Sequence, residues 1–224
     1  LLCALKRILH IKTPPILDVD ISSFHQAYTS GIIHRLSQFS SKAFDYMVYH
    51  TSSQIDYYKD QFPWLVHKSK FIHVGVDYDY WKLKSYPEIK EKDSYIVCVG
   101  YRKRDWDTLL KAYDEAKLKE KLYLIGNPDI KCENKNVVVL PFIPIDKLMT
   151  YIVNAKYSVI PLDDFNYSFG QLTILQQMAF GVPILAADVP AIRDYISCSG
   201  GIISYKPYNI DDLKEKLVKF SKFN

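Results

Sequence analysis

The sequence predicts an α/β protein built on two doubly wound parallel sheets. Short apolar segments typical of buried strands alternate with segments of helical periodicity, and they do so in two separate series. A stretch with clustered charges, a proline and no clear period divides the series. We therefore expect a first unit over residues 1–76, a linker over 77–93 and a second unit over 94–224.

The first series holds three predicted strands. Its elements are a helix over 1–10, a strand over 16–21, a helix over 32–39, a strand over 46–49, a helix from Ser52 or Ser53 to Phe62, and a strand over 71–74. His50 ends the second strand and could face a cleft, but a lone histidine is more often structural than catalytic.

The second series holds six predicted strands and is more regular. The strands cover 94–100, 121–126, 137–140, 157–161, 183–187 and 201–204. The helices between and after them cover 105–113, 145–154, 170–180, 191–195 and 210–220, the last capped by Asn209. Strands that alternate with helices favour parallel pairing with right-handed crossovers.

The helix of residues 170–180 carries the strongest signal for a binding site. Leu172, Leu175, Met178 and Ala179 fall on one stripe, and the helix ends at Gly181 before a compact apolar strand. At its start, Gly170 permits close approach of a ligand to the backbone. The free N–H groups of Gln171, Leu172 and Thr173 and the positive end of the helix dipole then suit a phosphate.

The polar residues of this helix extend the prediction. Thr173, Gln176 and Gln177 are spaced i, i+3, i+4, so we expect them to share a face from which a hydroxyl and an amide reach a sugar or ribose. An ordinary amphipathic helix with a solvated polar face explains the same pattern, and both alternatives stay open on pattern alone.

A second candidate lies after the strand of residues 94–100. Arg102, Lys103 and Arg104 place three adjacent cations at the carboxyl end of that strand, where open α/β sheets bind their ligands. A solvated loop is the alternative. Without the helix at Gly170, the solvated loop would be the favoured interpretation.

Three segments resemble the GT-B fold glycosyltransferases of family 4. Leu175-Gln-Gln-Met-Ala-Phe-Gly-Val-Pro-Ile184 is similar to the donor-site motif Leu-Glu-Ala-Met-Ala-x-Gly-x-Pro-Val-Ile of that family. Residues 104–112 resemble the first turn of its donor domain, and Val74-Gly-Val-Asp77 resembles the signature that ends its amino-terminal domain. The resemblance implies two Rossmann-like domains, of which the first lacks its initial half and is therefore incomplete.

The resemblance also implies roles for single residues. Arg104 would hold the donor diphosphate, with Arg102 as a second candidate, and the turn Phe142-Ile143 would hold the nucleotide base, unless it is only a hydrophobic turn packed on the sheet. Ser168 and Gln176 stand where many members carry an acidic pair that contacts the donor. Gln176 can still bind a ribose hydroxyl, whereas Ser168 cannot replace a carboxylate.

The function that the resemblance implies is retaining transfer of a sugar from a UDP or GDP donor to a glycan, lipid or other acceptor. No metal and no cofactor is expected, because cations and a helix end would stabilise the leaving diphosphate. The alternative is a non-catalytic nucleotide-binding accessory subunit or an inactive fragment, with a partner supplying the missing amino-terminal segment. A nucleotide-sugar epimerase of the same fold is a weaker alternative, since its acidic and histidine residues find no match.

The composition restricts the partners and the cellular location that we expect for the protein. The net charge of +4 favours an anionic substrate or an anionic membrane face. The sequence has no basic stripe interleaved with aromatic residues, so it gives no indication of nucleic-acid binding. Four scattered cysteines and the lack of an apolar run of roughly 18 residues favour a cytoplasmic protein. Peripheral contact of the lysine-rich final helix with the inner face of the membrane is the minority alternative.

Overall fold

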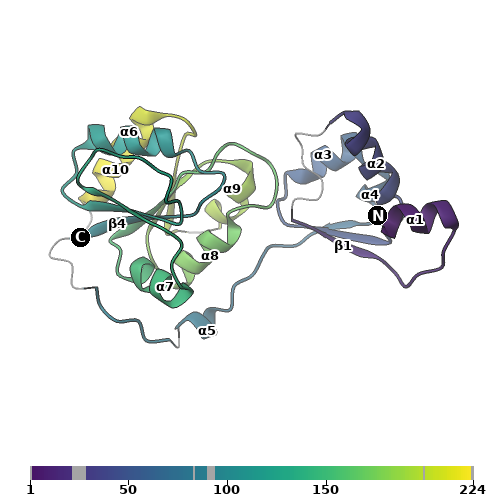
Figure 1. Ribbon diagram of the computed structural model, residues 1–224, viewed down its shortest axis with the longest axis horizontal. Helices are drawn as coiled ribbons and strands as arrows, with labels where there is room; N and C mark the ends of the chain where they lie inside the picture. The colour runs from purple at the N-terminus through teal and green to yellow at the C-terminus, as the bar shows by residue number, and fades with distance from the viewer. Residues whose placement is uncertain (1, 22–28, 83, 90–93, 199, 223–224) are drawn as a thin grey trace. The chain divides into compact units, whose positions relative to one another are not determined.

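The computed structural model describes residues 2–21, 29–82, 84–89, 94–198 and 200–222. They form two compact units (Figure 1). Unit 1 comprises Leu1–Val74, Phe165–Phe169 and Pro190–Asp194, and unit 2 comprises Gly75–Asp164, Gly170–Val189 and Tyr195–Asn224.

Unit 1 holds a parallel three-stranded sheet in the order β1-β2-β3. The strands are β1 (Leu17–Asp20), β2 (Tyr46–Tyr49) and β3 (Ser69–Phe71), and the helices are α1 (Leu2–Leu9), α2 (Gly31–Ser41), α3 (Gln54–Gln61) and α4 (Pro63–Val66). The core joins one face of the sheet to the helices through Met47, Tyr49, Tyr58, Phe62 and Leu65. Tyr49 and Tyr58 meet edge to face, with ring centroids 5.3 Å apart.

Unit 2 is a six-stranded parallel sheet in the order β6-β5-β4-β7-β8-β9. The strands are β4 (Tyr95–Val99), β5 (Lys121–Ile125), β6 (Val137–Leu140), β7 (Tyr157–Ile160), β8 (Ile184–Ala187) and β9 (Ile202–Tyr205). Strands β7 and β8 are buried at every residue, as the continuous apolar runs predict for a parallel sheet covered on both faces.

The helices of unit 2 cover both faces of this sheet. They are α5 (Tyr78–Lys82), α6 (Trp106–Ala116), α7 (Ile145–Val153), α8 (Gln171–Ala179) and α10 (Ile210–Ser221), while most of α9 (Pro190–Ile196) is grouped with unit 1. Figure 1 shows α6 and α10 on one side of the sheet and α7 and α8 on the other. The Asp105 carboxylate caps α6 by accepting the Thr108 N–H at 3.1 Å, and Asn209 caps α10 in the same way.

Two local expectations change. The third strand of unit 1 covers 69–71 rather than 71–74, and the predicted linker contains the short helix α5. The rings of Trp81 and Tyr86, on either side of residue 83, pack edge to face on Phe180, so this segment adds to the core of unit 2. The sequence did not predict this packing, because the aromatic residues stand among charged residues without helical periodicity.

None of the helices in the described part of the chain is long and apolar enough to cross a membrane. The lysines of α10 largely face acidic partners: Lys214 pairs with Glu115 and Asp211 at 2.8 Å, and Lys216 pairs with Asp212. Membrane contact through this helix stays a prediction.

Candidate functional site

The strand order of unit 2 defines where a ligand would bind. From β4 the chain winds outward through β5 and β6, then returns to the other side of β4 and winds through β7, β8 and β9. The direction therefore reverses between β4 and β7, and the loops that leave the carboxyl ends of these two strands diverge there. In open α/β sheets this switch point is the usual ligand crevice.

The loop after β4 is held by the buried side chain of Arg104, which is 7% exposed. Its Nε and Nη2 atoms donate to the carbonyl of Val99 at 3.3 and 3.1 Å, and Nη1 donates to the carbonyl of Arg102 at 3.2 Å. Gly100 allows this arrangement, because a Cβ at that position would lie 2.7 Å from Nη2 of Arg104. The hydrogen bonds of the Arg104 guanidinium thus hold the loop in its conformation.

The buried charge of Arg104 has no carboxylate within ion-pair distance among the described residues. Burial lowers the pKa of Arg104 from its ordinary value, and burial also raises the pKa of the neighbouring Cys98 thiol to about 12. Cys98 is therefore a neutral thiol and no candidate nucleophile. Contact between Arg104 and a diphosphate stays a prediction, whereas its hold on the loop is observed.

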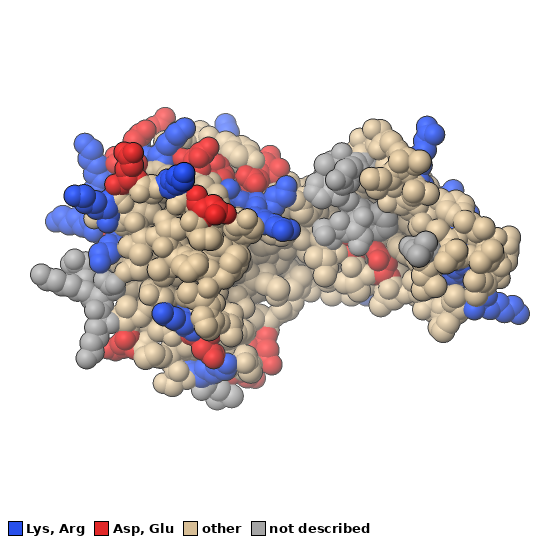
Figure 2. Space-filling view, viewed as in Figure 1, with Lys and Arg blue, Asp and Glu red and all other residues tan. Residues whose placement is uncertain are grey.

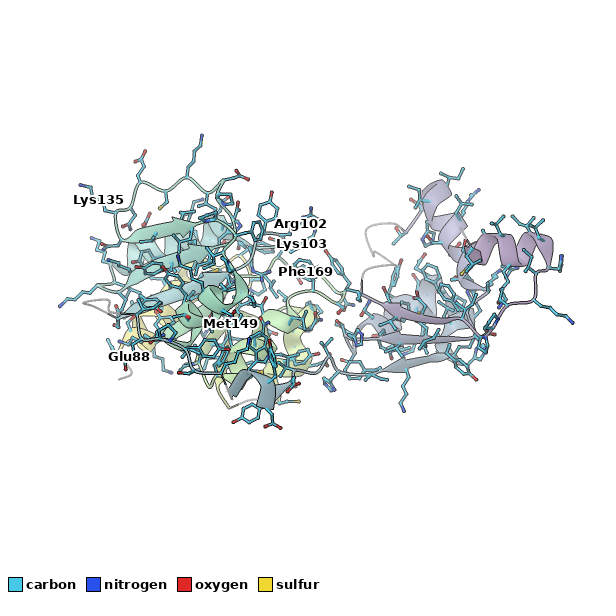
Figure 3. All side chains as sticks on the ribbon, turned by 60° about the horizontal axis from the view of Figure 1, so that its bottom comes forward. Glu88, Arg102, Lys103, Lys135, Met149 and Phe169 are labelled. Atoms are coloured by element: carbon cyan, nitrogen blue, oxygen red, sulfur yellow. The ribbon has the colours of Figure 1, made fainter. Side chains whose placement is uncertain are left out.

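The other two cations of the loop are exposed. Figure 3 shows Arg102 and Lys103 next to each other on the loop that follows β4, and both side chains are exposed. Lys103 adopts a left-handed conformation with φ of 57°, uncommon for a residue with a Cβ. Lys103 was not predicted as a separate site residue, although its place among three adjacent cations was a signal present in the sequence.

The loop after β7 ends at Gly170, the residue before α8. Gly170 has φ of 89°, and a Cβ there would lie 3.0 Å from a methyl of Leu162. Both facts explain why glycine opens this helix. The N–H groups of Leu172 and Thr173 belong to the first turn, where no intrahelical carbonyl is available to them.

Leu162 joins the two loops. It forms an antiparallel bridge with Arg104 and packs against Gly170, so the cationic loop and the start of α8 lie on either side of one leucine. The Asp105 N–H donates to the carbonyl of Pro161 at 2.7 Å, and the Asp163 N–H donates to the carbonyl of Lys103 at 3.3 Å. The structure therefore brings together two candidate segments separated by more than sixty residues. Leu162 and Asp163 were not predicted as site residues, because the only sign in the sequence is that they follow a predicted strand.

The faces of α8 differ from the predicted ones. Leu172 is 62% exposed although it was assigned to the apolar stripe, and the buried residues are Gln171, Ile174, Leu175 and Gln177. Thr173 and Gln176 are half-buried, as a ligand-facing position allows, but Gln177 is fully buried. The expectation that Gln177 shares their polar face is wrong, because α8 turns that side toward the core.

Both amide atoms of the Gln177 side chain are buried and have no hydrogen-bond partner. We expect Gln177→Met to raise the free energy of unfolding by about 1–2 kcal/mol, because an apolar side chain of similar length removes two buried unsatisfied groups. Denaturant unfolding measures the effect, with Gln176→Met as the control that should leave stability unchanged. A loss of stability in Gln177→Met would mean that the amide has a partner.

The turn predicted to hold a base lies beyond β6. Phe142 is 71% exposed and its ring meets that of Tyr101, from the loop after β4, edge to face at 5.7 Å. Ile143 instead packs against the buried residues of β4 and β5. Phe142 and Tyr101 are therefore the side chains available for stacking at this end of the sheet, while the base-binding role of the turn stays a prediction.

Ser168 and His50 lie in unit 1. Ser168 is 4% exposed, and its contact with a donor sugar stays a prediction. The Nδ1 atom of His50 lies 2.6 Å from the carbonyl of Ile72, which supports the structural role expected for a lone histidine.

In the described part of the chain, no three His, Cys, Asp or Glu side chains gather as a metal site would require.

A parallel sheet of this order, with helices on both faces, is a doubly wound, Rossmann-like α/β unit. Residues 93–222 match the family model described as Glycosyl transferases group 1, and the chain belongs to this family. A search of curated proteins found no match.

Solved structures of similar fold cover nearly the whole chain. Sucrose-phosphate synthase from Thermosynechococcus elongatus is 17% identical with a TM-score of 0.68, over 96% of this chain and 63% of that one. Anabaena HepE in complex with UDP and glucose is 12% identical with a TM-score of 0.75, over 98% and 65%. WaaG, a glycosyltransferase involved in lipopolysaccharide biosynthesis, is 16% identical with a TM-score of 0.68, over 93% and 67%.

These comparisons confirm the predicted GT-B fold, with an incomplete first sheet of three strands. The chain spans 63% of the length of the first of these proteins and 65% of the HepE structure.

Proposed function

We propose that the chain binds a nucleotide diphosphate sugar at the switch point of unit 2 and serves a retaining glycosyltransferase that acts on a glycan, lipid-linked or other acceptor. One observation carries the proposal: Leu162 holds the cationic loop after β4 and the amino-terminal end of α8 together. A diphosphate placed there meets backbone N–H groups from one side and exposed cations from the other.

The chemistry proposed for the site needs no metal. When the bond between sugar and diphosphate breaks, negative charge grows on the leaving phosphate, and the helix end together with Arg102 and Lys103 is suited to stabilise it. Thr173 and Gln176 would bind ribose or sugar hydroxyls, and Phe142 beside Tyr101 would stack on the base. The retaining outcome is proposed from the resemblance of the α8 segment to family 4.

The similar structures direct the choice of donor. HepE was solved with UDP, with UDP-glucose, and with UDP and glucose. We therefore propose a uridine donor before a guanosine donor.

Isothermal titration calorimetry with UDP, UDP-glucose and GDP tests the proposal. We expect binding of UDP in the micromolar to millimolar range, tighter than that of GDP and unchanged by EDTA, because helix amides and cations bind the phosphates without a bridging ion. Arg102→Ala should weaken binding about three- to tenfold without a change in stability, since the side chain is exposed. Absence of binding for all three nucleotides would refute the proposed site.

A non-catalytic nucleotide-binding subunit is the second candidate, and the three-stranded sheet of unit 1 favours it. An acceptor held by an incomplete domain gains little of the orientation effect, worth roughly 7–11 kcal/mol. We expect this 224-residue chain to bind UDP-glucose and yet transfer little or no sugar, as measured by release of UDP with and without an acceptor mixture. Transfer at the rate of an ordinary enzyme would exclude this second candidate.

A further inference from the structure

The net positive charge of the chain lies mostly in unit 1. Residues 1–74 carry eight Lys and Arg against five Asp and no Glu, a surplus of three within the net charge of +4. The other residues grouped with this unit add Arg193 and Asp194, which cancel. In Figure 2 the visible surface of residues 1–74 shows several Lys and Arg side chains and few Asp or Glu. Such an uneven distribution points to an anionic partner for unit 1.

Five basic side chains of unit 1 surround one cavity of about 480 Å³. They are Lys6, Arg7, His10, Lys42 and Lys68. Among the described residues that line the cavity, Asp45 supplies the one carboxylate. The basic residues come from three places in the chain: the end of α1, the turn between α2 and β2, and the position before β3. A cavity of this volume is in the range that holds a small molecule.

The cavity lies at the amino ends of the strands of unit 1. Asp45 directly precedes β2, and Lys68 directly precedes β3. The Asp45 carboxylate accepts the N–H of Ile16, the residue before β1, at 2.8 Å. Open α/β sheets hold their substrates at the opposite, carboxyl ends of the strands. The cavity is therefore a different kind of site from one that holds a substrate of the transfer reaction.

Three of the cations are held in place without being neutralised. The Arg7 guanidinium lies 4.6 Å from the centroid of the Phe39 ring, and Lys42 Nζ lies 4.6 Å from that of Trp64. Lys68 Nζ donates to a backbone carbonyl at 3.0 Å. In the described part of the chain, none of these three cations has a carboxylate within ion-pair distance. The rings and the carbonyl fix the positions of the cations and leave their charge in the cavity.

The same cations keep hydrogen-bond donors for a ligand. Within the described residues Arg7 makes no hydrogen bond, and its Nε atom is buried without a partner, so its Nη groups remain. Lys42 has its three N–H groups, and Lys68 uses one of three on the backbone. The donors on Arg7, Lys42 and Lys68 therefore suit a ligand with several acceptor oxygens.

Cations near the carboxyl ends of helices also have a simpler explanation. Lys6 and Arg7 lie in the last turn of α1 and Lys42 is the C-cap of α2, positions at which a cation stabilises a helix. Each helix end amounts to about half a negative charge, so the two ends and Asp45 together offset about two of the four Lys and Arg charges. About two positive charges remain, and helix stabilisation does not account for them.

We propose that this cavity binds a phosphate monoester. At neutral pH such a group carries a charge of about −1.5 to −2 and three acceptor oxygens, which match the remaining charge and the free donors. A carboxylate or a phosphodiester carries one negative charge and would balance only half of it. Ile11 and Phe44 add apolar surface to the cavity for the rest of the ligand. The proposal is independent of nucleotide binding in unit 2.

Two kinds of molecule carry this group, namely soluble phosphate esters and the lipid phosphatidic acid. The volume of the cavity suits a small soluble ester. The side chains of Ile8 and Leu9, each 60% exposed near the end of α1, would suit a lipid surface around the headgroup. The chemistry at the cations is the same for both, and the experiment separates the two sources.

Calorimetry with glycerol phosphate, in phosphate-free buffer at physiological ionic strength, tests the soluble source. We expect a Kd of about 1 mM or tighter. Lys42→Gln should weaken binding at least about threefold, whereas Lys42→Arg keeps the charge and should keep the affinity. Lys59→Gln is the matched control, because it removes the same charge from an exposed lysine of α3 that pairs with Asp56. Circular dichroism establishes that each variant folds, and Arg7→Gln serves as a second cavity variant.

Sedimentation with phosphatidylcholine vesicles that contain phosphatidic acid tests the lipid source, with phosphatidylglycerol, a diester, in its place as the control. Binding to the phosphatidic acid vesicles alone, weakened by Lys42→Gln, assigns the site to the headgroup. The proposal is overturned if neither probe binds, if both kinds of vesicle bind equally, or if Lys42→Gln and Lys59→Gln behave alike. It is also overturned if Arg102→Gln, rather than Lys42→Gln, weakens the binding of glycerol phosphate, since the anion would then bind in unit 2.

Discussion

Arg104→Ala should lower the stability of the protein and its affinity for UDP together. Arg104 is 7% exposed and its three guanidinium nitrogens donate to the carbonyls of Val99 and Arg102, so alanine leaves a cavity and carbonyls without donors. We expect a loss of about 2–4 kcal/mol in the free energy of unfolding, measured by denaturant titration. UDP affinity should fall more than tenfold, because the loop that carries Arg102 and Lys103 loses its support.

The sequence alone suggests a simpler expectation, in which Arg104 contacts the diphosphate and Arg104→Ala weakens binding without unfolding the protein. Arg102→Ala separates the two roles, since it removes an exposed cation from the same loop. If Arg104→Ala weakened binding at unchanged stability, the guanidinium would act on the diphosphate directly. If neither substitution affected binding, the loop after β4 would not belong to the site.

Gly170→Val should abolish most UDP binding. The backbone at Gly170 has φ of 89°, which costs a β-branched residue about 1–2 kcal/mol, and the new Cβ would lie 3.0 Å from Leu162. Relief of that contact moves the start of α8 or the loop after β7, and both are proposed to border the phosphates. We expect affinity to fall at least about tenfold by calorimetry.

Gly200→Val is the matched control, because no atom lies within 4 Å of a Cβ at that position. It should leave UDP affinity unchanged. Equal affinities for Gly170→Val and the wild type would contradict a phosphate site at this helix end. The sequence alone suggests Gln177→Ala as a control with little effect, but Gln177 is buried in the core, so its replacement would also change stability.

Most elements of unit 2 were predictable because each is encoded locally. The strand of residues 137–140 is found at its predicted bounds, and Asn209 caps its helix as predicted. Apolar runs and capping side chains act within a few residues, so the chain reveals them without tertiary information. Helix α5 was missed because its stability comes from Trp81 against α8 and Phe180, far along the chain.

The candidate site was predictable in its parts but not in its contacts. Gly170 and the cations after β4 stand out by residue type, and the order of alternating elements placed both at the carboxyl ends of strands. Periodicity could not decide that Leu172 faces outward and Gln177 inward, because the rotation of a helix about its axis is set by what it packs against.

The sequence by itself determined the α/β class, the family, and the identity of the glycine and the cations that the function is proposed to use. Only the tertiary structure decided that Arg104 is a support for the loop, that Leu162 joins the two halves of the candidate site, and that Gln177 faces the core. The physical reason is the range of the interactions. Helices and strands follow from neighbours along the chain, whereas burial of a charge, contact across a switch point and the buried face of a helix depend on segments that only folding brings together.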